Sequence, residues 1–208
     1  MKALMTGAML ALFSTTIVAA DDWRFVAGAD VWNSQGSGRV HNIGADGEYD
    51  DQNNWTGYLQ VENGIWLLPN ARLEMTDFST SGGSFDNDLQ AYDLTLYYRL
   101  LNSDTFNIDL GLTGRQYDGE FHTLRGSYDE GELLAFTAAE ILLPGTGISF
   151  FGDARIENGD HYDYRLGAAY QFSSVPFKVR AGWRDAAIDI ADIDQNIEGW
   201  FVGGEFNF

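Results

Sequence analysis

The chain ends with Trp200-Phe201-Val202-Gly203-Gly204-Glu205-Phe206-Asn207-Phe208, and this segment decides the fold. Trp200, Val202, Phe206 and Phe208 stand at every second position, and Gly204 completes the series. Successive side chains of a β-strand point to opposite faces, so the segment predicts a strand with one apolar face. Its length is also about what a tilted strand needs to cross a lipid bilayer.

Nine further segments show the same period of two. Their apolar faces cover residues 25–31, 55–61, 73–75, 92–98, 106–112, 133–141, 148–156, 162–172 and 177–183. With residues 200–208 they predict an all-β fold, a closed antiparallel up-and-down transmembrane β-barrel of ten strands. Eight strands are the alternative, if the third segment, where only Leu73 and Met75 are clearly apolar, and one neighbour lie outside the membrane.

The connections between these segments alternate in length. One set is compact and covers residues 63–70, 101–104, 144–146 and 173–176. The other set is longer and polar and covers 34–53, 79–88, 117–131 and 189–197, and its fifth member, 157–161, is short. Outer-membrane barrels place short turns in the periplasm and longer loops outside the cell, so we expect both chain ends to be periplasmic. A soluble periplasmic sandwich or lipocalin-like barrel, with its apolar faces turned inward, is the alternative.

Residues 1–20 have the pattern of a secretory signal peptide. Lys2 precedes an apolar run from Leu4, and Val18-Ala19-Ala20 before Asp21 fits a cleavage site. We therefore expect residues 1–20 to be removed and residues 21–208 to form the barrel in the outer membrane. An uncleaved membrane anchor is disfavoured because the apolar run is too short to span comfortably.

The composition excludes several functions. The sequence has no cysteine, so it holds neither a disulfide scaffold nor a thiolate metal site. Its 12 Lys+Arg stand against 31 Asp+Glu, for a net charge of −19, which argues against nucleic acid as a partner. Nothing in the pattern calls for a cofactor.

Charged residues fall on the faces opposite the apolar ones. Nine basic and ten acidic side chains take the predicted lumenal positions, and none of them takes a lipid-facing position. Because buried charges need partners, we predict an ion-pair network that fills the lumen. Its expected members are Arg72, Glu74, Asp93, Arg99, Asp109, Arg115, Asp153, Arg155, Arg165 and Arg180, with Tyr58, Tyr97 and Phe151 beside them.

Most remaining acids lie in the predicted external loops. Such a rim repels anionic lipopolysaccharide unless divalent cations bridge the two, and Asp189, Asp192 and Asp194 are one candidate cluster. A solvated acidic rim without bound metal is the alternative, since the cluster lacks the spacing of an EF-hand loop.

All three histidines, His41, His122 and His161, map to the loop side, where barrel enzymes carry their active sites. The pair Asp160-His161, or His122 with Ser127, could supply a base. No nucleophile elbow is present and nothing fixes these groups within reach of one another, so we do not expect an enzyme.

Three segments resemble a family of small proteobacterial outer-membrane β-barrel proteins. They are residues 67–73 (LLPNARL), 93–101 (DLTLYYRLL) and 143–147 (LPGTG), and the family is marked by a diglycine before the terminal aromatic, here Gly203-Gly204 before Phe208. The resemblance implies the barrel fold and the outer membrane, and it implies no catalytic residues. Trp200, Val202, Phe206 and Phe208 resemble the terminal signal that the barrel-assembly machinery reads.

The sequence therefore predicts a monomeric barrel with a structural or surface-interaction role, in contact with outer-membrane lipids and lipopolysaccharide. A narrow porin-like channel for small solutes is the first alternative. A lipid A hydrolase or protease with a loop-side active site is the second.

Overall fold

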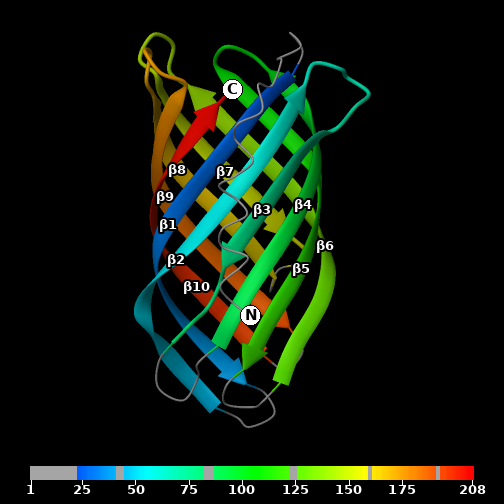
Figure 1. Ribbon diagram of the computed structural model, residues 1–208, viewed down its shortest axis with the longest axis vertical. Helices are drawn as coiled ribbons and strands as arrows, with labels where there is room; N and C mark the ends of the chain where they lie inside the picture. Colours follow the sequence, from blue (N-terminus) through cyan, green and yellow to red (C-terminus); the bar gives the residue numbers. More distant parts are fainter. Residues whose placement is uncertain (1–22, 41–44, 82–86, 122–125, 159–160, 191–192) are drawn as a thin grey trace, which may run out of the picture.

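The computed structural model describes residues 23–40, 45–81, 87–121, 126–158, 161–190 and 193–208. Within these ranges ten strands form a closed antiparallel barrel, which confirms the predicted fold (Figure 1). The strands are β1 Trp23–Val40, β2 Ala45–Asn63, β3 Asn70–Asp77, β4 Asn87–Asn102, β5 Phe106–Phe121, β6 Gly126–Leu142, β7 Ile148–Ile156, β8 Tyr162–Gln171, β9 Phe177–Ile190 and β10 Ile193–Asn207. Each strand pairs with its sequence neighbours, and β1 pairs with β10. In the described ranges no helix is long and apolar enough to cross a membrane.

The predicted alternation sets the two faces of the wall. On β4, Tyr92 and Leu94 are exposed outside the barrel, whereas Asp93 and Thr95 are buried inside. None of the residues predicted to face outward is buried. The third segment, around Leu73 and Met75, belongs to a full barrel strand, so the eight-strand alternative was wrong.

Aromatic side chains ring the outer face at two levels. Trp183 and Trp200 pack edge to face, with ring centroids 5.1 Å apart, and Phe177 packs on Phe206 at 4.7 Å. Tyr162 is the first residue of β8 and Phe172 follows its last, so the two lie about 33 Å apart along the strand direction. At the usual barrel tilt this separation corresponds to a height of about 25 Å, the height of the apolar band in transmembrane barrels.

The two ends of the barrel differ. The end where β1 begins and β10 finishes, uppermost in Figure 1, carries short turns at 64–69, 103–105, 143–147 and 172–176; we call it the turn end. We call the other end the hairpin end. It carries the β1–β2, β3–β4, β5–β6, β7–β8 and β9–β10 connections.

The predicted long loops were wrong for three connections. Strand pairing continues to Val40 and Ala45, to Phe121 and Gly126, and to Ile190 and Ile193, so most of 34–53, 117–131 and 189–197 is paired strand. The strands are thus 8 to 19 residues long. Apolar alternation detects only the part of a strand that has an apolar face, and a polar hairpin satisfies its backbone by pairing beyond that part. The 79–88 connection is described only at 79–81 and 87–88.

The C-terminal segment closes the barrel. The backbone amide of Phe208 donates to the carbonyl of Phe25 at 2.8 Å, and the amide of Phe25 donates back at 3.2 Å. Gly203 lies opposite Asp30, where a Cβ would collide with the Asp30 side chain and the Ala29 carbonyl. The ring of Phe177, from β9, covers Gly204. The diglycine thus makes room for close packing on both faces of β10.

Candidate functional site

An apolar cluster lies in the lumen toward the hairpin end. It consists of Trp32, Phe78, Leu89, Ala91, Tyr117, Ala186, Ile188, Ile197 and Phe201, and we call it the apolar cap. Trp32 and Phe78 meet edge to face, with centroids 6.0 Å apart. Trp32 and Phe201 alternate with outward-facing residues, so the sequence pattern could have placed them in the lumen.

A network of buried ions fills the centre of the barrel. We call it the central ion-pair network; its members are Arg72, Arg115, Arg155, Arg165, Arg184, Glu74, Asp93, Asp153 and Asp163. Arg115 binds Asp93 through two nitrogens at 2.7 and 2.8 Å and reaches Asp163 at 2.7 Å. The side chain of Arg155 is fully buried, and its nitrogens lie 3.0 Å from Asp93 and 3.2 Å from Glu74.

The network spans the lumen from wall to wall. Glu74 on β3 accepts a hydrogen bond from Arg165 on β8 at 3.1 Å. Arg184 on β9 donates to Thr56 on β2 at 2.8 Å, and its guanidinium carbon lies 4.8 Å from the ring centre of Trp32. These contacts tie the opposite walls together and join the network to the apolar cap.

A second, wetter ring of ions lies toward the turn end. Arg99 binds Asp109 at 2.8 Å and Glu62 at 2.7 Å, and Arg24 reaches Glu62 at 2.7 Å. Lys178 lies 3.3 Å from Glu140 and 3.4 Å from Glu205. A cavity of about 110 Å³ beside these groups has room for a few waters.

Every residue of the network predicted from the sequence takes part in an ion pair. Arg72 pairs with Glu74, Asp153 pairs with Arg165, and Arg180 lies 3.2 Å from Asp30. Tyr58 and Tyr97 are buried, and Phe151 is partly buried against the apolar cap. Two charged side chains are about half exposed at the ends of the barrel: Arg24 at the turn end and Glu157 at the hairpin end. Solvent reaches both side chains there.

The predicted loop-side sites are only partly described. His41, His122, Asp160 and Asp192 lie outside the described residues, as does the side chain of Ser127. Asp189 and Asp194 face each other in register across β9 and β10.

His161 lies in the turn between β7 and β8, and its side chain is buried. It contacts Tyr117 and two carboxylates, Glu132 and Glu157. Sequence reasoning missed Glu132, although its place before outward-facing Leu133 already points it inward.

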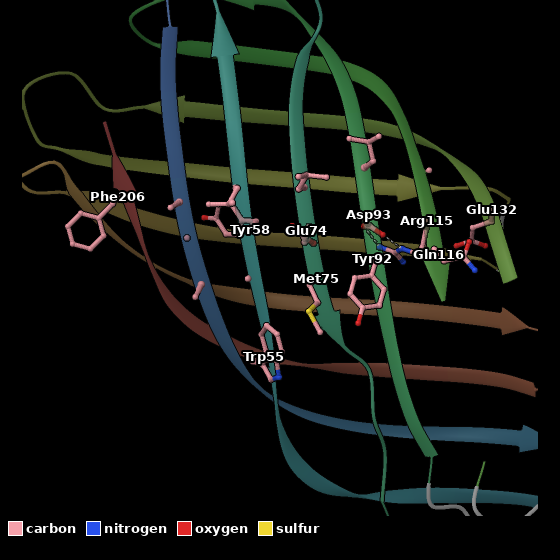
Figure 2. Close-up of a pocket in the computed structure, with 18 of the residues that line it drawn as sticks. Trp55, Tyr58, Glu74, Met75, Tyr92, Asp93, Arg115, Gln116, Glu132 and Phe206 are labelled. Carbon is pink, nitrogen blue, oxygen red and sulfur yellow. Dashed lines mark hydrogen bonds and ion pairs between the residues drawn. The ribbon is translucent and has the colours of Figure 1, made fainter. Parts of the chain in front are cut away.

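A large hollow lies on the outer face, across β1 to β6, β9 and β10, with a volume of about 1330 Å³. Figure 2 shows Trp55, Met75 and Tyr92 from three adjacent strands around it. Small residues, among them Ala27 and Gly57, form its floor. It is a concave stretch of the apolar outer face, and the charged residues that border it, such as Asp93 and Arg115, are paired inside the wall.

No protein-family model matches the chain, and no curated protein matches it. Several solved structures are similar. An outer membrane channel from Pseudomonas putida F1 is 10% identical, covering 89% of this chain and 94% of the channel, with a TM-score of 0.51. Neisserial surface protein A is 13% identical over 88% of this chain and 97% of its own, with a TM-score of 0.42. Ail, the attachment invasion locus protein of Yersinia pestis, is 11% identical over 88% and 98%, with a TM-score of 0.36. The first likeness supports the fold of an outer-membrane barrel, and at this identity it supports the fold alone.

Proposed function

We propose that this chain is an outer-membrane barrel with a closed lumen, which presents its paired hairpins at the cell surface as a structural or interaction element. The filled lumen carries the proposal. Arg155, Arg165, Arg184 and Trp32 are almost inaccessible to water, so at their levels the barrel has no open path. A wall cross-linked by ion pairs, with paired hairpins at one end, fits a support for surface contacts.

The outer face supports a location in the membrane. About half or more of the surface of Leu73, Leu94 and Val202 is exposed on the outside of the closed barrel. A soluble protein would expose a belt of this kind to water at a high cost, whereas lipid chains cover it without one. A soluble sandwich or lipocalin-like barrel would turn its apolar face inward. Here the buried charged residues face inward and the apolar face points outward.

A channel is the competing function, and the similar Pseudomonas protein is an outer membrane channel. The central ion-pair network and the apolar cap argue against conduction in this chain, because both would have to rearrange to admit a solute. The same proposal includes four further points: cleavage of a signal peptide at 1–20, periplasmic chain ends, a monomeric state, and contact with the assembly machinery through residues 200–208.

Cysteine labelling tests the location and the orientation, because the natural sequence has no cysteine. Ser37→Cys lies on the β1–β2 hairpin, and Ser174→Cys lies in a turn at the opposite end; both positions are exposed. On intact cells of a Gram-negative host, we expect a membrane-impermeant maleimide to label Ser37→Cys and not Ser174→Cys.

Permeabilising the outer membrane should make both positions reactive, which controls for their accessibility. Labelling of Ser174→Cys alone on intact cells would invert the proposed orientation. Equal labelling of both would place the protein outside the membrane.

A further inference from the structure

Three potential metal ligands meet at the hairpin end, outside the central ion-pair network. His161 lies just before β8, Glu157 follows β7, and Glu132 comes from the adjoining strand β6. One ligand atom from each of the three lies within 4.8 Å of the others. In the described part of the chain this is the only group of three or more such side chains so arranged.

One metal ion can bind only one ring nitrogen of His161, and the three ligand atoms of the group lie within 4.8 Å of one another. Nε2 of His161 lies 3.1 Å from Glu132 Oε1, and Nδ1 lies 3.7 Å from Glu157 Oε2. Ligand atoms at about 2.0–2.1 Å from a tetrahedral Zn²⁺ are roughly 3.3 Å from one another. Glu157 is the half-exposed member, so it can close the remaining gap without disturbing the wall.

Two of the ligands are already held in place. The His161 side chain is 3% exposed, and its backbone amide donates to Asn158 Oδ1 at 2.9 Å. The Glu157 amide donates to the His161 carbonyl at 3.1 Å, which fixes the turn between β7 and β8. Glu132 Oε1 is buried and has no hydrogen bond of good geometry, a costly state that a bound cation would relieve.

The surroundings suit a cation. The Tyr117 hydroxyl lies 3.1 Å from His161 Nε2, so it is a further oxygen beside the ring nitrogen that faces Glu132. Arg115 contacts the Tyr117 hydroxyl, and its positive charge is paired with Asp93 and Asp163. Two carboxylates and one imidazole give this group a net negative charge, and the half-exposed Glu157 side chain reaches solvent.

We propose that Glu132, Glu157 and His161 bind a divalent transition-metal ion, Zn²⁺ foremost, and thereby pin β6 to the β7–β8 turn. The imidazole decides the metal class, because Ca²⁺ and Mg²⁺ prefer sites made of oxygen alone. The three protein ligands leave a fourth position for water. This site is distinct from the predicted aspartate cluster at residues 189–194.

Calorimetric titration of the untagged, folded barrel in detergent micelles tests the site, with ZnCl₂ as the probe and MgCl₂ and CaCl₂ in parallel. We expect one Zn²⁺ per chain, with binding at least tenfold tighter than that of Mg²⁺ or Ca²⁺. Glu157→Gln and His161→Gln should each weaken Zn²⁺ binding at least tenfold. Asp118→Asn, an exposed acid on the outer face of β5, should leave it unchanged.

Glu157→Gln alters only a half-exposed side chain in a turn, so its folding is not at risk, and native electrophoretic mobility checks each variant. Absence of Zn²⁺ binding by the natural protein would overturn the proposal. So would undiminished binding by Glu157→Gln and His161→Gln, since it would place the metal elsewhere, for example at His41 or His122.

Discussion

Asp163→Asn is expected to lower the free energy of unfolding by about 3–5 kcal/mol, because it removes one partner from buried charges. Asp163 is 1% exposed and accepts from Arg184 at 2.8 and 2.9 Å and from Arg115 at 2.7 Å. Asparagine keeps the shape but loses the charge, and it turns amide hydrogens or a neutral oxygen toward two guanidinium groups. Arg184 would keep its hydroxyl partner Thr56, which does not replace a carboxylate.

Equilibrium unfolding in urea, with the barrel in lipid vesicles, measures this effect as a shift in the midpoint. Asp118→Asn makes the same chemical change at an exposed position on the outer side of β5, and it should alter the stability by no more than about 0.5 kcal/mol. Equal midpoints for the two variants would mean that the central ion-pair network is not closed around Asp163.

Leu94→Arg is expected to cost about 2–4 kcal/mol in the same vesicles, the penalty for a cation near the bilayer midplane. Leu94 faces outward on β4, in register with Leu73 and Gly114, and it lies between the aromatic residues Tyr92 and Tyr98. An arginine here has only hydrocarbon around it and must bend toward the interface.

Leu100→Arg supplies the matched control, because Leu100 faces solvent beyond Tyr98 near the turn end. The interface tolerates a cation there, so the cost should be about 0–1 kcal/mol. A barrel that stood in water would show no such dependence on depth, and equal effects of the two arginines would contradict the membrane-embedded outer face.

The sequence pattern was enough to predict the wall. Apolar residues such as Leu94 and Leu96 fix the register of a strand, and the intervening positions, such as Asp93, are then lumenal without further information. The same parity holds for Leu134 and Phe136 on β6, where both faces are apolar, and the structure buries these two side chains inside.

Partner choice inside the lumen could not be predicted. Glu74 and Arg165 come from β3 and β8, and they meet only because the closed ring has a particular tilt and radius. Alternation gives the face of each residue but not its height relative to a strand on the far wall. Alternation places Trp32 and Phe201 on the lumenal face, but it does not predict that they belong to a common apolar cap.

The paired hairpins and the cluster around His161 could not be predicted from the sequence for a different reason. Beyond the membrane band neither face of a strand needs to be apolar, so the polar stretch from 34 to 53 has the composition of a loop although most of it is paired. His161 lies in the turn between β7 and β8, and its burial depends on Tyr117 and Glu132 from two other strands. The spacing of these residues in the sequence does not predict that contact.

Ion conductance tests the closed lumen most directly. Purified, folded barrel would be inserted into a planar lipid bilayer, with insertion verified by protease protection of the reconstituted protein, and current recorded in concentrated KCl. Because the apolar cap and the central ion-pair network fill the lumen, we expect a current that stays at the level of the protein-free bilayer. Steady, discrete conductance steps whose size grows with salt concentration would contradict the account, because they require an open water path past Arg155, Arg165 and Arg184.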